Sequence, residues 1–311
     1  MARDRLELTD KQERMYEVLR KQIVKRAKHN RQGSYDTKKR YFQAVDRFCR
    51  FLSKEFALQK FANISNKHLA AYVEFQKNRG VTDKTLKTDL SAIRFFHDKF
   101  DSTRYILQTD NELLGANKLS RSGQNKAWSH REFQSFQALC KDMGNVRMAA
   151  AAALARREGL RIHETLKIDR SAAEKALKTG EVIIKGKGGK IRSVPISSES
   201  AQLLHELIQD VERGNKLFVQ EGEKTHLVIK QFQNFINRHR EKFQDPERAA
   251  RIENGENIKM NVTFHGLRHA YAQDRYEEAK ERGLNDRDAR LEVSRLLGHE
   301  RDEVTRIYIA N

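Results

Sequence analysis

Residues 263–269 have the sequence Thr-Phe-His-Gly-Leu-Arg-His, residues 296–299 have the sequence Leu-Leu-Gly-His, and Tyr308 follows. His265 and Arg268 are three positions apart, so a helix places both on one face near its start. Helix N-termini attract phosphate groups through their free backbone N–H groups. An arginine clamp, two imidazoles and a phenol are groups that could break a phosphodiester bond without water or metal.

Each of these residues also has a simpler interpretation. His265 and His269 have the i, i+4 spacing of a metal-binding H-E-x-x-H helix, but Gly266 stands where that motif requires glutamate. We therefore expect no metal and no cofactor. An isolated His299 after Gly298 would be a histidine at the exposed end of a helix. Tyr308 alone would be a partly buried aromatic residue that anchors the last helix.

Charge indicates the class of partner. The 311 residues carry a formal net charge of +18, and the pI is about 9.9. A polyanion is therefore the expected partner. The basic residues are spread along the chain rather than gathered on one amphipathic helix, which favours duplex DNA over a membrane surface. The longest apolar stretch, residues 148–155, is too short to span a bilayer.

Two features of the sequence indicate the cellular compartment: its cysteines and its first thirty residues. Cys49 and Cys140 lie far apart, each in an amphipathic helical pattern, and are expected to be buried free thiols in a reducing cytoplasm. The first thirty residues are strongly charged and lack the apolar core of a secretory signal. We expect a cytoplasmic protein that neither crosses nor binds a membrane.

The first part of the chain predicts a helical domain, residues 1–113. An apolar stripe at helical spacing runs through Phe42, Val45, Phe48, Phe51 and Leu52. Thr82 is a predicted N-cap. The predicted helices cover residues 10–29, 36–58, 67–78 and 83–99. A polar stretch without apolar periodicity, residues 114–127, predicts a linker. The expected DNA contacts are Lys38, Lys39, Arg40, Lys84, Lys87, Arg94 and Arg121.

The second domain is predicted over residues 128–311. Ser129 and Glu132 have the spacing of a capping box. Two β-rich runs, residues 181–185 and 190–196, flank a glycine-rich turn that contains Lys187, which predicts a hairpin or a small sheet. The remaining predicted helices cover residues 199–212, 227–243, 264–282, 286–297 and 302–309. The sequence thus predicts a mainly α protein with a small β-sheet.

A further arginine stands in the stretch Gly159-Leu-Arg161-Ile-His-Glu164. Gly159 ends one predicted helix and a new turn begins, so Arg161 is expected to project from a helix terminus into a cleft. Glu164 could pair with it. By itself Arg161 could equally be an ordinary surface arginine, and Arg156 and Arg157 are nearby alternatives.

The order and spacing of these residues resemble those of the tyrosine recombinases, the lambda-integrase family. The catalytic set that the resemblance implies is Arg161, Lys187, His265, Arg268, His299 and Tyr308. It also implies an all-α, SAM-like core-binding domain, a linker and an α+β catalytic domain, with the two domains forming a C-shaped clamp around DNA. The catalytic domain of type IB topoisomerases is similar.

The resemblance implies a mechanism. Tyr308 would attack a DNA phosphate to form a 3′-phosphotyrosyl bond, and Arg161 and Arg268 would hold the nonbridging oxygens. His299 would add a hydrogen bond, Lys187 would protonate the leaving 5′ oxygen, and His265 would assist in moving the tyrosine proton.

The partners implied are double-stranded DNA recombination sites and further protomers, from dimer to tetramer on DNA. The resemblance also implies DNA-bending accessory proteins as partners and a bacterial cytoplasmic protein associated with the nucleoid. The function is then integration or excision of a mobile element. A relaxing topoisomerase and a DNA-binding regulator without catalysis are the alternatives.

Two departures from the family pattern bear on assembly. Only three residues follow Tyr308, whereas many relatives have a tail that docks onto a neighbouring protomer. We therefore expect assembly through other surfaces. Residues 241–260 are longer and more polar than a minimal connection requires, which fits either an insertion that contacts DNA or a partner, or a solvated loop with a short helix.

Overall fold

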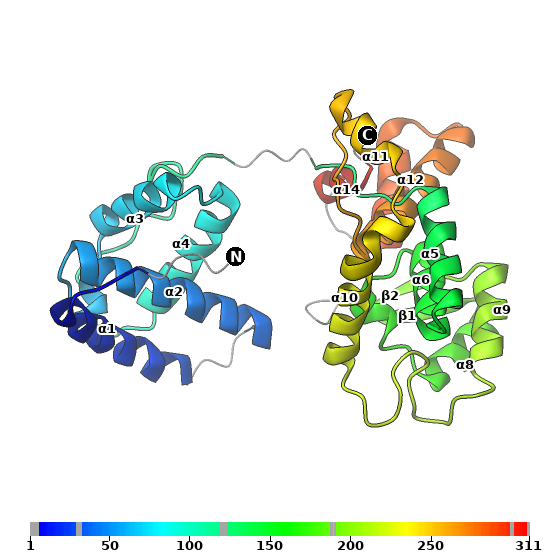
Figure 1. Cartoon of the computed structure of the whole chain (residues 1–311), viewed down its shortest axis with the longest axis horizontal. Coiled ribbons are helices and arrows are strands. Elements are labelled where there is room, and N and C mark those ends of the chain that lie inside the picture. The colour runs from blue at the N-terminus through cyan, green and yellow to red at the C-terminus, as the bar shows by residue number, and fades with distance from the viewer. Residues whose placement is uncertain are drawn as a thin grey trace. The chain divides into compact units, whose positions relative to one another are not determined.

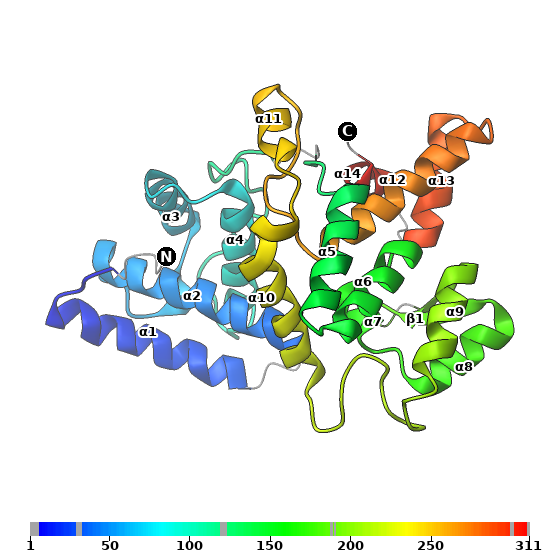
Figure 2. The ribbon, with the colours of Figure 1, turned by 45° about the vertical axis from the view of Figure 1, so that its right-hand side comes forward.

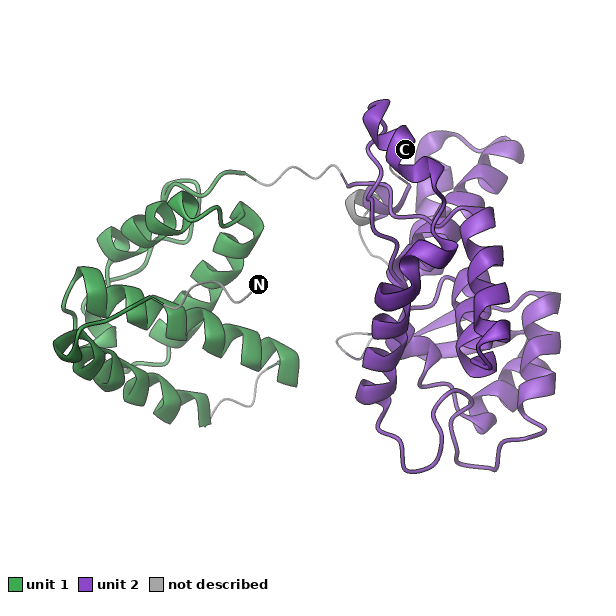
Figure 3. Cartoon of the chain, viewed as in Figure 1, with its two compact units in different colours: residues 1–120 green, residues 121–311 purple. Residues whose placement is uncertain are grey.

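The computed structural model describes residues 6–28, 33–118, 123–186, 189, 191–298 and 302–309. It divides into two compact units, residues 1–120 and 121–311, each with its own hydrophobic core (Figures 1 and 3). Within these ranges the first unit is entirely helical, and the second combines helices with one two-stranded sheet. The predicted fold class is confirmed.

The first unit is built around aromatic side chains from α2 and its neighbours. Phe48 packs edge-to-face on Phe61 and on Tyr72, with ring centroids 6.2 and 5.1 Å apart. Four of the five predicted stripe residues are buried, and Phe42 is partly buried against them. The elements are α1 (Asp10–Lys28), α2 (Tyr35–Glu55), η1 (Phe61–Asn63), α3 (Asn66–Asn78) and α4 (Asp83–His97).

A buried polar network connects three of these helices. Arg47 of α2 donates to Asp89 of α4 at 2.9 Å, and the hydroxyl of Tyr72 on α3 donates to the same carboxylate at 3.0 Å. Gln76 in turn donates to the Tyr72 oxygen. Because Asp89 is buried, its charge is stabilised only while these donors stay in place. The network therefore holds α2, α3 and α4 together.

The second unit surrounds an alanine-rich helix, α6 (Val146–Glu158). This helix contacts α5 (His130–Asp142), α7 (Ile162–Thr165), α9 (Ser198–Leu207) and α12 (His265–Glu281) (Figure 2). Residues 148–155 of α6 are almost wholly buried, so the short apolar stretch in the sequence is a core helix. No helix of the described residues has the length and apolar content required to cross a membrane.

The hairpin lies beside α8, and the C-terminal helices follow. Strands β1 and β2 are antiparallel, with Glu181 opposite Pro195 and Lys185 opposite Ile191. The second unit contains α5 (His130–Asp142), α6, α7 (Ile162–Thr165), α8 (Arg170–Thr179), β1 (Glu181–Lys185), β2 (Ile191–Pro195), α9 (Ser198–Leu207), α10 (Thr225–Phe243), α11 (Glu247–Glu253), α12 (His265–Glu281), α13 (Asp286–Leu297) and α14 (Asp302–Tyr308).

The predicted linker, residues 114–127, is packed at both ends. Leu114 and Ala116 are buried in the core of the first unit. At the other end Asn125 forms an isolated parallel β-bridge with Ile258. Leu114, Ala116 and Asn125 thus contact the packed units. Isolated apolar residues such as Leu114 and Ala116 leave no periodic signal in the sequence.

The polar segment 241–260 forms a short helix, α11, that is anchored to the beginning of the second unit. Arg248 is buried and donates to Glu132 at 2.8 and 2.6 Å and to the backbone carbonyl of Ala127 at 2.9 Å. Glu132 also completes the predicted capping box with Ser129, which is confirmed. Removing one partner of such a buried pair leaves an uncompensated charge, so we assign this segment a structural role.

Candidate active site

Tyr308, the last residue of α14, lies against α12. Its hydroxyl is 3.2 Å from Nε2 of His265, and only 7% of the residue is exposed. Desolvation and then the positive charges of Arg268 and Arg161 lower the pKa of His265 to about 4. His265 is therefore neutral at pH 7, and the tautomer with its proton on Nδ1 is the one that can accept a hydrogen bond from the phenol.

Arg268, on the same helix, is fully buried beneath this pair. Its guanidinium carbon lies 5.6 Å from the centre of the Tyr308 ring. The two terminal nitrogens donate to the carbonyls of Gly159 and, at 2.6 Å, of Leu297. These carbonyls stand at the C-terminal ends of α6 and α13, where helix dipoles favour a positive charge. Burial, followed by the charge of Arg161, lowers the pKa of Arg268 to about 10, which leaves it protonated at neutral pH.

The carboxylate of Glu164 lies among the positively charged arginines of the site. Its carboxylate accepts from Arg161 at 2.8 Å and from Arg192 at 3.0 and 2.8 Å, and it lies 4.0 Å from Arg268. Burial alone would raise the pKa of Glu164, but hydrogen bonds from Arg192 and from the Arg161 backbone lower it to about 2. One ionised carboxylate therefore holds three guanidinium groups together.

The turn that presents Arg161 agrees with the sequence prediction. Gly159 ends α6 with φ +61, a left-handed conformation that glycine adopts without strain. A Cβ at this position would lie 2.4 Å from the ring of Tyr271, so the close packing also requires glycine. Arg161 is the N-cap of α7, and 26% of its side chain is exposed. Glu164 pairs with it as suggested.

Gly266 has a packing role next to His265. A Cβ there would lie 2.3 Å from the carbonyl oxygen of Lys126 and 2.5 Å from the ring of Trp128. Trp128 also donates to the Thr263 carbonyl at 2.7 Å. The glycine thus lets residues 126–128 pack directly on the start of α12.

We expect Gly266→Ala to displace residues 126–128 from α12, because the clash is with backbone, and to destabilise the second unit by about 1–3 kcal/mol. Chemical denaturation measures this directly. Gly283→Ala is the comparison: Gly283 has a positive φ and open space around it, so this change introduces backbone strain without a clash. If Gly266→Ala is the milder of the two changes, the packing argument is wrong.

Lys187 and His299 lie outside the described residues, as does Arg121. Their described neighbours agree with the sequence prediction: β1 and β2 form the two strands on either side of residues 186–190, and Gly298 caps α13 in a left-handed conformation.

Sequence analysis missed three residues. Arg192 was overlooked because strand alternation does not reveal which polar side chain turns inward. His269 was considered only as a metal ligand, yet its ring stacks on Tyr308. Gln273 bonds to the Tyr308 carbonyl at 3.4 Å, a contact that no local motif signals. Among the residues that the structure describes, no group of three His, Cys, Asp or Glu side chains could hold a metal ion.

A family match accounts for this arrangement. The family model described as "Phage integrase family" matches residues 128–311, and the model described as "Phage integrase, N-terminal" matches residues 16–100. The chain belongs to the phage integrase family, the tyrosine recombinases. No curated protein matches its sequence.

Solved structures of other recombinases have a similar fold. A lambda integrase dimer bound to a COC′ core site is 14% identical with a TM-score of 0.61, covering 97% of this chain and 81% of that chain. XerH site-specific recombinase bound to palindromic difH substrate is 16% identical with a TM-score of 0.60, covering 97% and 94%. The Tn1549 transposon integrase in complex with transposon right end DNA is 15% identical with a TM-score of 0.58, covering 94% and 95%.

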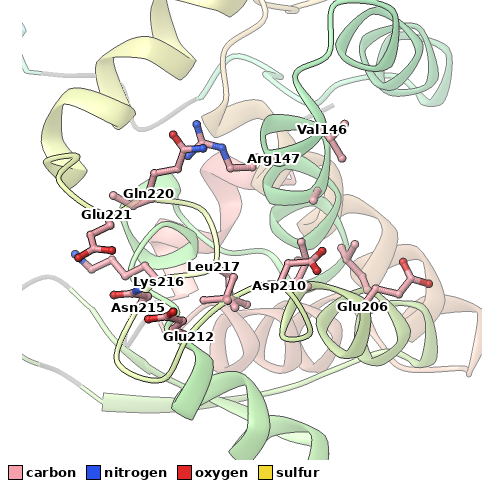
Figure 4. Close-up of a pocket in the computed structure, with 15 residues that line it drawn as sticks. Val146, Arg147, Glu206, Asp210, Glu212, Asn215, Lys216, Leu217, Gln220 and Glu221 are labelled. Carbon is pink, nitrogen blue, oxygen red and sulfur yellow. The ribbon is translucent and has the colours of Figure 1, made fainter.

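One pocket of this recombinase lies away from Tyr308. It has a volume of about 600 Å³ and lies between α6, α9 and residues 210–221 (Figure 4). Its lining includes none of the residues around Tyr308. Leucine and valine side chains form much of it, together with Glu206 and Asp210.

Proposed function

We propose that this tyrosine recombinase cuts and rejoins DNA through a 3′-phosphotyrosyl intermediate on Tyr308, in the integration or excision of a mobile element. The observation that carries the proposal is the contact of the Tyr308 hydroxyl with His265, next to a cluster of arginines. A phenol becomes a strong nucleophile only as its proton leaves. A neutral histidine within hydrogen-bond distance is the group that accepts this proton.

The bond changes balance without a cofactor. The Tyr308 oxygen forms a bond to phosphorus as the bond from phosphorus to the 5′ oxygen breaks. In our proposal Lys187 gives a proton to that leaving oxygen, and His299 donates a hydrogen bond to a nonbridging oxygen. Rejoining reverses these steps with a 5′ hydroxyl as the attacking group. The phosphotyrosyl bond conserves the energy of the broken bond, so no ATP is required.

We propose different parts for the two clamping arginines. A quarter of the Arg161 side chain is exposed, so it can contact phosphate oxygens directly and with two donors. Arg268 is covered, so in the free protein it acts through its buried positive charge. We propose that Arg268 contacts a phosphate oxygen once DNA is bound.

We propose that the first unit binds the phosphate backbone of DNA. Among the predicted contacts, Lys39, Arg40 and Lys84 are exposed, and Lys38 and Lys87 are half-buried. Arg94 is a weaker candidate than the sequence predicted, because burial lowers its pKa and its Nε donates to the Gln108 carbonyl at 2.7 Å.

Other arginines of the first unit also have partners within the protein. Arg47 pairs with Asp89, Arg50 lies over the ring of Tyr16, and Arg26 lies over the ring of Phe100. The number of basic residues in the sequence therefore overstates the charge available to DNA.

Lys39→Gln combined with Lys84→Gln is expected to weaken DNA binding nearly equally for all sequences. The slope of log K against log salt should fall by about 0.9 for each phosphate that the lysines no longer neutralise. Lys175→Gln combined with Lys178→Gln, two exposed lysines of α8 outside the predicted set, is the charge-matched control. The measurement is a salt titration of binding. An unchanged slope in the double variant would remove these lysines from the interface.

We also propose that protomers assemble on DNA, from a dimer to a tetramer that exchanges strands in pairs. The named lambda integrase structure is itself a dimer on a core site. For the cellular setting we propose the bacterial cytoplasm at the nucleoid, with DNA-bending proteins as accessory partners.

A nicked suicide duplex carrying the attachment site of the element that encodes the chain tests the proposal. Loss of the short fragment next to the nick prevents rejoining, so the expected result is a covalent protein–DNA adduct that persists in denaturant. The absence of an adduct at this site would contradict the proposal. Relaxation of any supercoiled plasmid irrespective of sequence would favour a topoisomerase instead.

A further inference from the structure

We propose that His269 and Gln273 are positioning residues that hold Tyr308 in the orientation required for attack. The inference rests on the proposed role of Tyr308 as nucleophile. Together with His265 they occupy positions i, i+4 and i+8 of α12, which lie along one face of a helix. Each contacts a different part of Tyr308: His265 the hydroxyl, His269 the ring, and Gln273 the carbonyl oxygen.

His269 fixes the plane of the phenol ring. The two ring centroids are 4.3 Å apart and the rings are inclined by 23°, a stacked arrangement. A hydrogen bond joins the His269 ring to the Tyr308 backbone. Only 1% of His269 is exposed. Burial is the main cause that lowers the pKa of His269 to about 3, and the neighbouring His265 and Lys126 add to it, so the ring stays neutral at pH 7.

Gln273 fixes the end of α14. Its amide nitrogen donates to the Tyr308 carbonyl at 3.4 Å and to Oδ1 of Asn125 at 3.0 Å. Asn125 is itself held, because its N–H donates to Asn257 and its carbonyl accepts from Lys259, both at 2.8 Å. The backbone of Tyr308 is thereby tied to the strand-like segment with which the second unit begins.

These contacts are needed because α14 is short. A helix of seven residues has little stability of its own and takes its position from the surfaces around it. The contact between the hydroxyl and His265 is formed only in a narrow range of ring orientations. Misplacement of a reacting group by about 1 Å costs about a hundredfold in rate. Removal of the contacts that either His269 or Gln273 makes with Tyr308 should therefore slow cleavage without weakening DNA binding.

Three variants separate this role from simple filling of space. His269→Phe keeps the ring and removes the hydrogen bond, and His269→Gln keeps a donor and removes the stacking ring. Gln273→Met keeps the length of a half-buried side chain and removes both hydrogen bonds, so it tests the proposal even if the His269 variants fold poorly. His97→Phe is the matched control, because His97 is a buried histidine of the first unit that also bonds to a backbone group.

The experiment measures single-turnover cleavage of the suicide duplex, DNA affinity, and the ¹⁹F spectrum of protein labelled with 3-fluorotyrosine. The Tyr308 resonance is assigned from its absence in Tyr308→Phe. We expect each His269 variant to slow cleavage by about ten- to a hundredfold and Gln273→Met by about tenfold. All three should bind DNA as the unchanged protein does and should move the Tyr308 resonance, whereas His97→Phe should change neither the cleavage rate nor that resonance.

Wild-type cleavage rates together with an unmoved Tyr308 resonance in His269→Phe and Gln273→Met would overturn the proposal. The spectrum reports the surroundings of Tyr308 whether or not DNA is cut. If the unchanged protein forms no adduct, the proposed function fails, while the spectrum still shows whether these residues hold the tyrosine.

Discussion

Tyr308→Phe should form no covalent adduct with DNA, a loss on the order of 10⁴-fold or more in cleavage rate, as expected when a nucleophile is removed. The substitution deletes only the hydroxyl. A phenylalanine ring still stacks on His269 and still covers Arg268, so folding and DNA affinity should be preserved. The measurement is adduct formation on the suicide duplex, with DNA binding followed in parallel.

Tyr276→Phe is the control for this substitution. Tyr276 lies on α12, and its hydroxyl donates to Asp286 at 3.1 Å, so the control also removes one hydrogen-bonded hydroxyl. We expect it to form the adduct at the rate of the unchanged protein. If Tyr308→Phe still forms the adduct, another residue is the nucleophile.

Glu164→Gln should destabilise the second unit by about 3–5 kcal/mol and abolish cleavage, because it removes the buried negative charge that faces three guanidinium groups. Glutamine has nearly the same shape, so a change in packing does not explain the effect. Chemical denaturation and adduct formation measure the two consequences. Glu256→Gln is the control, since its pair with Arg251 is exposed and should contribute little.

The same carboxylate predicts a pH dependence. The pKa of Glu164 is lowered from 4.5 to about 2 in the folded protein. Its contribution to stability is therefore fully present above pH 4.5 and is lost as the pH falls towards 2, where the folded state takes up the proton. In that window Glu164→Gln should lose less stability than the unchanged protein. Equal acid sensitivity of the two proteins would show that Glu164 does not bear this charge.

Local signals in the sequence predicted local structure well. The Ser129–Glu132 capping box, Gly159 as the end of α6 and Gly298 as the end of α13 follow from short-range steric and hydrogen-bond preferences. Thr82 shows the limit of such signals. It is the N-cap of α4, but its side chain bonds to the Thr85 hydroxyl instead of the backbone.

Long-range charge pairing could not be predicted. The motif order brought His265, Arg268 and Tyr308 together in one hypothesis, and the three do lie together. Glu164, however, is shared by arginines from separate elements, and only the tertiary fold decides which guanidinium groups turn inward. For the same reason Arg94 could not be distinguished by sequence from the exposed Lys84 on the same helix.

Identification of the adduct on the suicide duplex is the most direct measurement. Protease digestion and mass spectrometry locate the modified residue, and end-labelled strands show which DNA end is attached. We predict a single phosphotyrosyl peptide that contains Tyr308, joined to a 3′ phosphate, with a free 5′ hydroxyl on the other strand end. An adduct on any other residue, or one joined through a 5′ phosphate, would contradict the account.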